Sequence, residues 1–275
     1  MKEYSMSKSE YKSEMIEKRK VLFNKANDQV HKIIYEPKLY LRYLQLQATL
    51  GYTVTNTLMV MADNPNVTCV KDFTRWKELG AYPNKGEKGI PILEPTNKQY
   101  KRKDGSVGAM YNIKFVFDIS QTNYTGELNF KQYPSKQDLL DALSYKCEIN
   151  PIIVKGEYDY PRKAFYSQKD NCIYLYEYQS IDDMITGLMR EYSHIEFEVP
   201  CDFVMYSVVY MLCYKYGISN VDTTFIGDFH QFFMTKNEKQ GKSDLEEIKR
   251  VFTIITKRID NGLYVKENKT NESAL

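Results

Sequence analysis

Residues 151–216 constrain the fold of this chain more than any other segment. Short apolar runs bounded by turn residues predict three strands, over 151–154, 164–167 and 172–176. Apolar residues at helical spacing then predict two helices, over 181–198 and 203–216, and Gly217 ends the second. Helices and strands are both predicted along the chain, and we predict the α+β fold class.

The composition excludes several kinds of protein. The 275 residues suffice for one large domain or two ordinary ones, and a hydrophobic content of 43% supports real cores. Because 38 basic residues balance 36 acidic ones, a surface for nucleic acid would have to arise from local charge segregation. Five scattered cysteines without a CxxC pair indicate neither a zinc ribbon nor a disulfide framework. With no leader and no long apolar run, we predict a cytoplasmic protein.

A polar, turn-rich segment at 120–134 divides the chain. We predict an N-terminal domain over 1–125, a linker over 126–134, a second domain over 135–265 and a polar tail over 266–275. In the second domain, Ser135 followed by Asp138 predicts a helix start, and Ser243 followed by Glu246 predicts the start of the last helix.

The N-terminal half is predicted to begin with helices and to continue with a β-hairpin. Pro37 suits the first turn of a helix that ends near Gly51, and a further helix is predicted over 53–62. Asp104-Gly105 is a hairpin turn signal, and the alternating residues 113–119 predict the returning strand.

Between these elements, residues 73–95 combine aromatic, basic and glycine residues. Phe73, Trp76 and Leu79 recur at helical spacing, and residues 84–89 form a lysine–glycine loop. From 71 to 114 there are ten basic and five acidic residues, a net charge of +5. Such a segment suits a surface on which bases stack and phosphates are neutralised. The alternative is an ordinary helix, turn and strand with Trp76 in the core.

In the second domain, residues 190–194 read Arg-Glu-Tyr-Ser-His on the predicted helix. Zinc peptidases of the HExxH type need two histidines four residues apart and a glutamate that activates the bound water. Arg190 stands at the first position, and a guanidinium has no lone pair for a metal. Three interpretations stay open: Arg190 pairs with a carboxylate in an inactive site, the run is a coincidence, or Glu191, His194 and Glu198 hold a metal from one helix face.

Other enzyme classes lack their sequence patterns. The chain has no GxSxG, no cysteine in a recognisable nucleophile context and no GxxxxGK[ST] loop. A serine or cysteine hydrolase and a nucleoside triphosphatase are therefore not indicated.

Several motifs together resemble the N-terminal domain of ArdC-type antirestriction proteins, which plasmids and conjugative elements carry. They are GYTVTNTLM at 51–59, FxxWKxLG at 73–80, KGEKGIxILxP at 85–95 and FDISQT at 117–122. The second half is similar to the zincin-like metallopeptidase domain of that family, through the strands at 164–166 and 173–175 and the two helices after them. The position that best matches the third, acidic metal ligand of the family is Tyr206.

The resemblance implies a single-stranded-DNA-binding domain followed by a degenerate zincin-like domain, and protection of incoming DNA against restriction. Single-stranded DNA is the expected partner, together with a component of a restriction-modification system. Since Arg190 and Tyr206 replace expected ligands, we predict no catalytic residue, no metal, no cofactor and no enzyme activity.

The predicted DNA contacts fall into three groups. Stacking platforms are Trp76 and Tyr82, phosphate contacts are Arg75, Lys77, Lys85, Lys88 and Lys114, and Asn56 adds a polar contact. Two alternatives remain, namely an active metal-dependent peptidase that uses Glu191, His194 and Glu198, and a protein-interaction module that acts on a restriction system.

Overall fold

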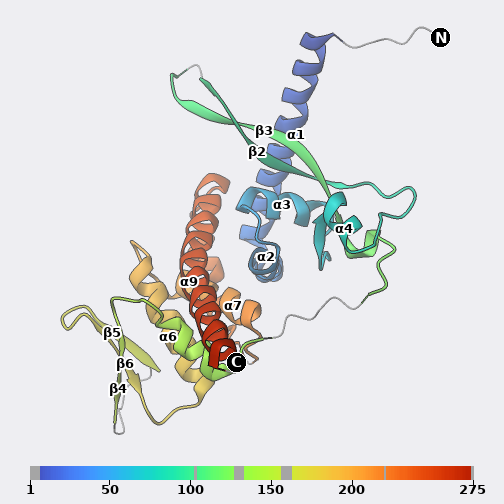
Figure 1. The fold of residues 1–275 in the computed structure, drawn as a ribbon. Helices are drawn as coiled ribbons and strands as arrows, with labels where there is room; N and C mark the ends of the chain where they lie inside the picture. The colour runs from blue at the N-terminus through green and yellow to red at the C-terminus, as the bar shows by residue number, and fades with distance from the viewer. Residues whose placement is uncertain (1–6, 102–103, 127–132, 156–162, 220, 274–275) are drawn as a thin grey trace. The chain divides into compact units, whose positions relative to one another are not determined.

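The computed structural model describes residues 7–101, 104–126, 133–155, 163–219 and 221–273. Helices and β-strands make up most of these residues, which confirms the α+β class (Figure 1). The chain divides into two compact units. The first comprises Met1–Glu127 and Asn237–Lys242, and the second comprises Leu128–Lys236 and Ser243–Leu275. Because the first unit includes a short segment from late in the chain, the linear division at 126–134 remains a prediction.

Three helices open the first unit, and local sequence signals fix most of their ends. They are α1 (Lys8–Tyr35), α2 (Pro37–Leu50) and α3 (Val54–Asp63). The Ser7 hydroxyl accepts from the backbone nitrogen of Glu10, whose carboxylate accepts from Ser7, so a capping box starts α1. Helix α2 ends at Gly51, which has a φ of 69°, a conformation that glycine adopts without strain. The predicted start and end of α2 are thus confirmed.

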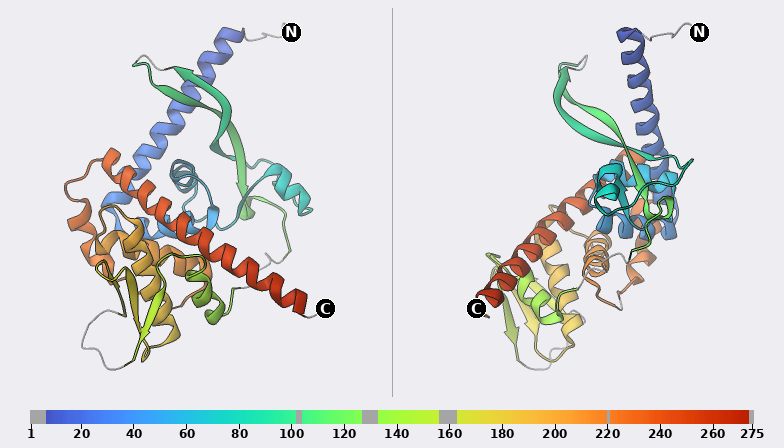
Figure 2. Two further views of the ribbon diagram at one scale, coloured as in Figure 1. Left: turned by 60° about the vertical axis from the view of Figure 1, so that its left-hand side comes forward. Right: turned by 45° about the vertical axis from the view of Figure 1, so that its right-hand side comes forward.

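An antiparallel sheet follows, with strand order β1-β3-β2. Its strands are β1 (Val70–Asp72), β2 (Ile90–Lys101) and β3 (Val107–Asp118), and the short helix α4 (Phe73–Glu78) lies between β1 and β2 in sequence. Strands β2 and β3 form the predicted hairpin, and Gly105 in its turn has a φ of 83°. The hairpin extends beyond the rest of the sheet beside α1 (Figure 2). After β3, the 3-10 turn η1 (Ile119–Gln121) is capped by Asp118.

Helix α1 packs across the hairpin. The Nε atom of Arg19 donates to the carbonyl oxygen of Tyr111 at 2.6 Å, and the rings of Phe23 and Tyr111 meet edge to face with centroids 6.0 Å apart. Helix α3 is joined to β2 through Asn56, as described below. These contacts hold the helices and the sheet of the first unit together.

The second unit contains a mixed three-stranded sheet of order β4-β6-β5. Its strands are β4 (Pro151–Val154), β5 (Ala164–Ser167) and β6 (Cys172–Tyr176), and all three coincide with the predicted ranges. Strand β4 runs parallel to β6, and β5 runs antiparallel to it. Helices α5 (Lys136–Leu143), α6 (Ile181–Glu196) and α7 (Asp202–Tyr216) contribute the core, and α6 packs on β5, α5 and α7.

The C-terminal helices differ in part from expectation. The turn η2 (Thr224–Asp228) and the short helix α8 (Phe229–Phe233) were not predicted, and α9 (Glu238–Ser273) begins before Ser243. The start at Ser243 was wrong because Asn237 and Gln240 exchange side-chain hydrogen bonds with each other's backbone nitrogens and start the helix earlier. The inward face of α9 is confirmed, since its predicted apolar residues are buried: Leu245, Ile248, Phe252, Ile255 and Ile259.

Within the described residues, no helix combines the length and the apolar character that crossing a membrane requires.

Candidate functional site

Trp76 lies in the core of the first unit. Its side chain is 0% exposed, and its indole nitrogen donates to the carbonyl oxygen of Phe117 at 2.9 Å. The ring of Tyr124 packs against it with centroids 5.7 Å apart. The prediction of Trp76 as a base-stacking platform was wrong, because the ring is used to attach α4 to β3.

Asn56 is also structural. Its amide nitrogen donates to the carbonyl oxygen of Leu93 and its amide oxygen accepts from the nitrogen of Leu93, both at 2.9 Å. The side chain is buried, so both its donor and its acceptor serve the link between α3 and β2. The predicted contact of Asn56 with DNA is corrected on this ground.

Lys114 lies between two carboxylates on the sheet. Its ammonium group is 2.9 Å from Asp72 and 3.2 Å from Glu94. The hydrogen bond to Asp72, and then that to Glu94, raise the pKa of Lys114. Because two carboxylates already pair with its ammonium group, Lys114 is less suited to bind a phosphate than the other predicted contacts.

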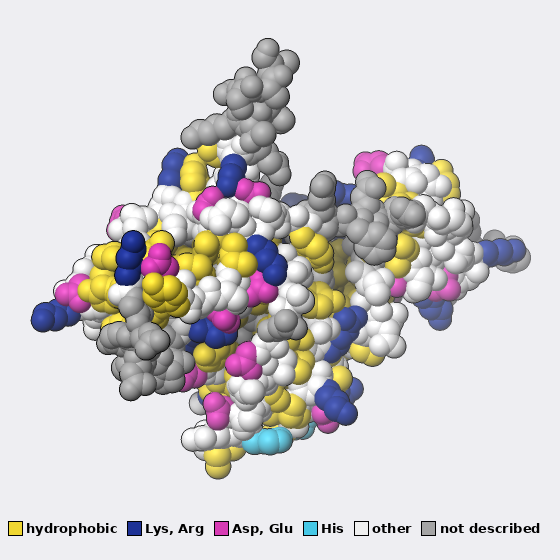
Figure 3. All heavy atoms as spheres, turned by 90° about the horizontal axis from the view of Figure 1, so that it is seen from below, with side chains coloured by type: hydrophobic (Ala, Val, Ile, Leu, Met, Phe, Trp, Pro, Cys, Tyr) yellow, Lys and Arg dark blue, Asp and Glu magenta, His cyan; other side chains and the backbone are white. Residues whose placement is uncertain are grey.

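The other predicted contacts remain on the surface. Arg75, Lys77, Tyr82, Lys85 and Lys88 are exposed. None of the four cations among them forms a salt bridge with another described residue. In Figure 3, by contrast, basic and acidic side chains alternate over the face shown, in keeping with the balanced charge of the chain.

Phe73 is a surface residue that the sequence argument missed. It is 50% exposed and Tyr82 is 45% exposed, and their rings meet edge to face with centroids 6.2 Å apart. Helical spacing suggested one buried face containing Phe73 and Leu79, but α4 has fewer than two turns and buries only Trp76. We call Phe73, Arg75, Lys77, Tyr82, Lys85 and Lys88 the basic–aromatic surface.

The lysine–glycine loop at 84–89 is held in place from η1. The backbone nitrogen of Asn84 donates to the carbonyl oxygen of Gln121 at 2.8 Å. The side-chain amide of Gln121 donates to the carboxylate of Glu87 and to the carbonyl oxygen of Lys88, both at 2.9 Å. Gly86 has a φ of 94°, which an L side chain rarely adopts. The loop therefore presents Lys85 and Lys88 on a fixed backbone.

In the second unit, the guanidinium of Arg190 pairs with two carboxylates. Nη1 donates to Glu191, and Nη2 donates to Asp202 at the start of α7 at 2.6 Å. Burial opposes the charge of Arg190, but the hydrogen bond to Asp202 and the charge of Glu191 outweigh burial and raise its pKa. Its planar group also lies 5.6 Å from the ring centre of Tyr206. Arg190 and Tyr206, which occupy two positions expected to hold metal ligands, thus contact one another.

Glu191 and His194 lie close together, but Glu198 does not extend their helix face. The second oxygen of Glu191 accepts from the backbone nitrogen of Tyr166 at 2.9 Å, and Nδ1 of His194 is 3.7 Å from it. Helix α6 ends at Glu196 because Phe197 is extended, with a ψ of 135°, and buries its ring. The alternative in which Glu191, His194 and Glu198 share one helix face was wrong. Over the described ranges, no group of three or more His, Cys, Asp or Glu could hold a metal ion.

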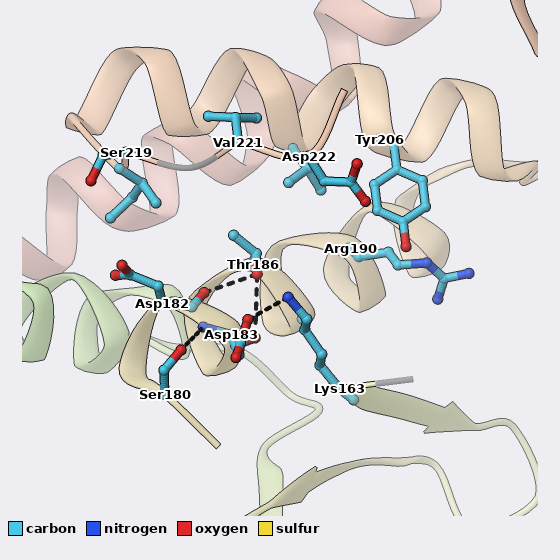
Figure 4. Close-up of a pocket in the computed structure, with 14 residues that line it drawn as sticks. Lys163, Ser180, Asp182, Asp183, Thr186, Arg190, Tyr206, Ser219, Val221 and Asp222 are labelled. Carbon is cyan, nitrogen blue, oxygen red and sulfur yellow. Dashed lines mark hydrogen bonds and ion pairs between the residues drawn. The ribbon is translucent and has the colours of Figure 1, made fainter. Parts of the chain in front are cut away.

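A cavity of about 310 Å³ lies next to this centre, lined by residues of α6, α7 and their neighbours. Figure 4 shows Arg190 and Tyr206 at one end and Ser180, Asp182 and Asp183 toward the other. Lys163 and Asp183, which both line the cavity, form an ion pair. Among the lining residues that the structure describes there is no histidine or cysteine, and charged side chains such as Lys163, Asp182 and Asp183 are present.

Comparisons with known proteins add one likeness. No family model matches the chain, and no curated protein matches it. Two crystal structures of the antirestriction ArdC protein from plasmid R388 resemble the fold, each covering 76% of this chain and 86% of that one. The metal-free structure has a TM-score of 0.47 at 16% identity, and the Mn(II)-bound structure has 0.48 at 17%. Both structures are of a protein that bears the name of the family that the sequence motifs resemble.

Proposed function

We propose that the first unit binds single-stranded DNA on the basic–aromatic surface. The observation that carries this proposal is the exposed ring pair of Phe73 and Tyr82 on the same segment as four cations that form no salt bridge with another described residue. Bases stack on aromatic faces whatever their sequence, at about 1–3 kcal/mol per base, and lysines bind phosphates through counterion release.

Single strands suit this surface better than duplex. The bases of a duplex are already stacked on one another, so exposed aromatic side chains cannot stack on their faces. The bases of a single strand are free to stack on such side chains. Asn56, whose amide could both donate to and accept from the edge of adenine, is committed to Leu93. We therefore expect binding with little sequence preference from this surface.

Fluorescence anisotropy with labelled single-stranded and duplex DNA of equal length tests the proposal. We expect the single strand to bind more tightly, and the double variant Phe73→Ala/Tyr82→Ala to lose most of this preference. The matched control is Tyr178→Ala/Tyr264→Ala, which removes two exposed rings from the second unit. Equal affinity of the wild-type chain for single strands and duplex would reject the stacking role.

For the second unit, we propose a zincin-like domain without peptidase activity. Arg190 supports this proposal, because its guanidinium is paired with Glu191 and Asp202 and offers no lone pair to a metal. The carboxylate of Glu191, which would otherwise activate water, is held by Arg190 and by the backbone of Tyr166. Elemental analysis of the purified protein tests this: one equivalent of zinc per chain, with peptide cleavage that a chelator abolishes, would refute it.

In the cell, we propose that the chain protects incoming DNA of a mobile element against restriction. The likeness of the motifs to ArdC-type proteins suggests this role, and binding of single strands supplies a physical means of masking DNA. An interaction module directed at a restriction component is the alternative. Full protection by a chain in which Arg75, Lys77, Lys85 and Lys88 are replaced by Gln would favour the alternative over masking.

A further inference from the structure

An apolar groove of about 370 Å³ lies in the first unit between α1 and the β2–β3 hairpin. Val21 and Leu22 of α1 form one wall, and Pro91, Ile113 and Phe115 form the other. The side chain of Phe115 is 55% exposed, so part of its surface is accessible to a ligand. Single exposed apolar residues are common, but a groove with several of them indicates a binding site.

The Cβ atom of Phe115 lies next to Gly89, at the end of the lysine–glycine loop. A Cβ atom placed on Gly89 would lie 2.9 Å from the Cβ of Phe115 and 2.9 Å from Cζ of Phe117. The backbone at the end of the loop therefore passes directly over this part of β3, one residue after Lys88. A strand whose phosphates are bound by the loop would have a base within reach of the groove.

Two acidic residues of α1, Glu14 and Glu17, also line the groove. Glu14 pairs with Lys18 at 2.7 Å, whereas Glu17 has no ion pair or hydrogen bond with any residue that the structure describes. A carboxylate accepts hydrogen bonds from the exocyclic amino groups of cytosine and adenine. Thymine presents no such amino group, so it gains nothing from Glu17.

We propose that this groove binds one base of the single strand, stacked on Phe115, with its amino group donating to Glu17. This inference rests on the proposed function, because the loop has to hold the neighbouring phosphates. Lys18, which also lines the groove, is paired with Glu14, so the groove suits a base better than a phosphate. The volume of about 370 Å³ is at the small end of ligand sites, which suits a single base. The groove thereby adds a preference for cytosine or adenine over thymine to an otherwise sequence-tolerant surface.

Anisotropy of the full chain with labelled oligo(dC) and oligo(dT), each of about 12 nucleotides, tests the inference at one fixed salt concentration. We expect oligo(dC) to bind about 5-fold or more tightly than oligo(dT). Phe115→Ala should weaken oligo(dC) binding about 5-fold to 100-fold. Phe115→Leu keeps the apolar bulk without the aromatic face and should weaken it as well. Tyr178→Ala, a ring exposed in the second unit, is the control and should change nothing.

Glu17→Ala separates the base preference from overall affinity. Loss of a negative charge favours both oligonucleotides, whereas loss of the acceptor disfavours oligo(dC) alone. The measured quantity is therefore the ratio of the two affinities, which should fall to about one. Salt-dependent binding that Phe115→Ala leaves intact would overturn the groove and spare the proposed function. Wild-type affinity in Phe115→Leu, or no preference for oligo(dC), would also overturn it. A wild-type chain that binds neither oligonucleotide would refute both proposals.

Discussion

The indole nitrogen of Trp76 donates a hydrogen bond to the carbonyl oxygen of Phe117, across 41 residues of sequence. This bond turns the tryptophan of α4 inward and leaves Phe73, one turn earlier, on the surface. Stacking is therefore assigned to Phe73 and Tyr82, and Trp76 is assigned to the stability of the unit.

Trp76→Phe should destabilise the first unit by about 2–4 kcal/mol, since it leaves a cavity and a carbonyl oxygen without its donor. The free energy of unfolding from urea titrations measures this. The folded variant should keep its affinity for single-stranded DNA, measured well below the midpoint of unfolding. Loss of DNA affinity in a fully folded variant would restore the stacking role of Trp76.

Asn56→Leu should cost about 2–4 kcal/mol of stability. It leaves both backbone groups of Leu93 without their hydrogen bonds in a buried position. Asn112→Leu, at an exposed position of β3, is the control and should change stability by less than about 0.5 kcal/mol. Similar melting temperatures for the two variants would contradict the structural role of Asn56.

Gly89→Ala should destabilise the first unit by about 1–3 kcal/mol, because the new methyl group would lie 2.9 Å from Phe115 and Phe117. Gly227→Ala is the matched control, since nothing lies within 4 Å of its added Cβ. Thermal unfolding of both variants compares them directly. An unchanged melting temperature for Gly89→Ala would show that the loop does not pass as close to β3 as described.

Arg190→Met should destabilise the second unit by about 3–5 kcal/mol, because the buried carboxylate of Glu191 would lose its partner. Arg190→Met/Glu191→Gln should recover part of this loss, because no buried charge remains. A double-mutant cycle on the unfolding free energy measures the coupling between the two residues. Additive effects would contradict a direct ion pair.

The carboxylate of Asp72 should make stability depend on acid pH. The hydrogen bond from the backbone nitrogen of Arg75 outweighs burial, and with the help of Lys114 it lowers the pKa of Asp72 from 3.8. A lowered folded pKa gives stability that is present above pH 3.8 and is lost as the pH falls through the folded value. Asp72→Asn should therefore destabilise at pH 7, and the difference from wild type should shrink below pH 3.8. A constant difference across this range would contradict the account.

Short-range signals predicted the elements well and their environment less well. Ser135 caps the helix that follows it, as its spacing to Asp138 indicates, and the three strands of the second unit coincide with the predicted ranges. Such signals act within one turn of helix or one strand. All the residues that make up one signal are therefore close together in the sequence and can be recognised there.

The environment of single side chains depends on partners far away in the sequence. Asn56 is committed to a backbone 37 residues later, and no local pattern announces this pairing. The end of α6 at Glu196 depends on Phe197 burying its ring, which removed Glu198 from the face predicted for it. In contrast, the pairing of Arg190 with a carboxylate was one of three interpretations of the sequence, and it is the one that supplies a buried guanidinium with an acid.

The dependence of DNA affinity on salt tests the central proposal most directly. A plot of log K against log salt concentration has a slope of about −0.7 per neutralised phosphate for a single strand. If Arg75, Lys77, Lys85 and Lys88 each contact a phosphate, these four residues contribute about −3 to the slope. Replacing all four by Gln should make the slope about 3 units shallower.

The control replaces Lys146, Lys155, Lys169 and Lys257, which are exposed in the second unit, and should keep the wild-type slope. A wild-type slope near zero would contradict the assignment of DNA binding to this surface. Equal slopes for the wild type and the variant with four Gln substitutions would contradict it as well.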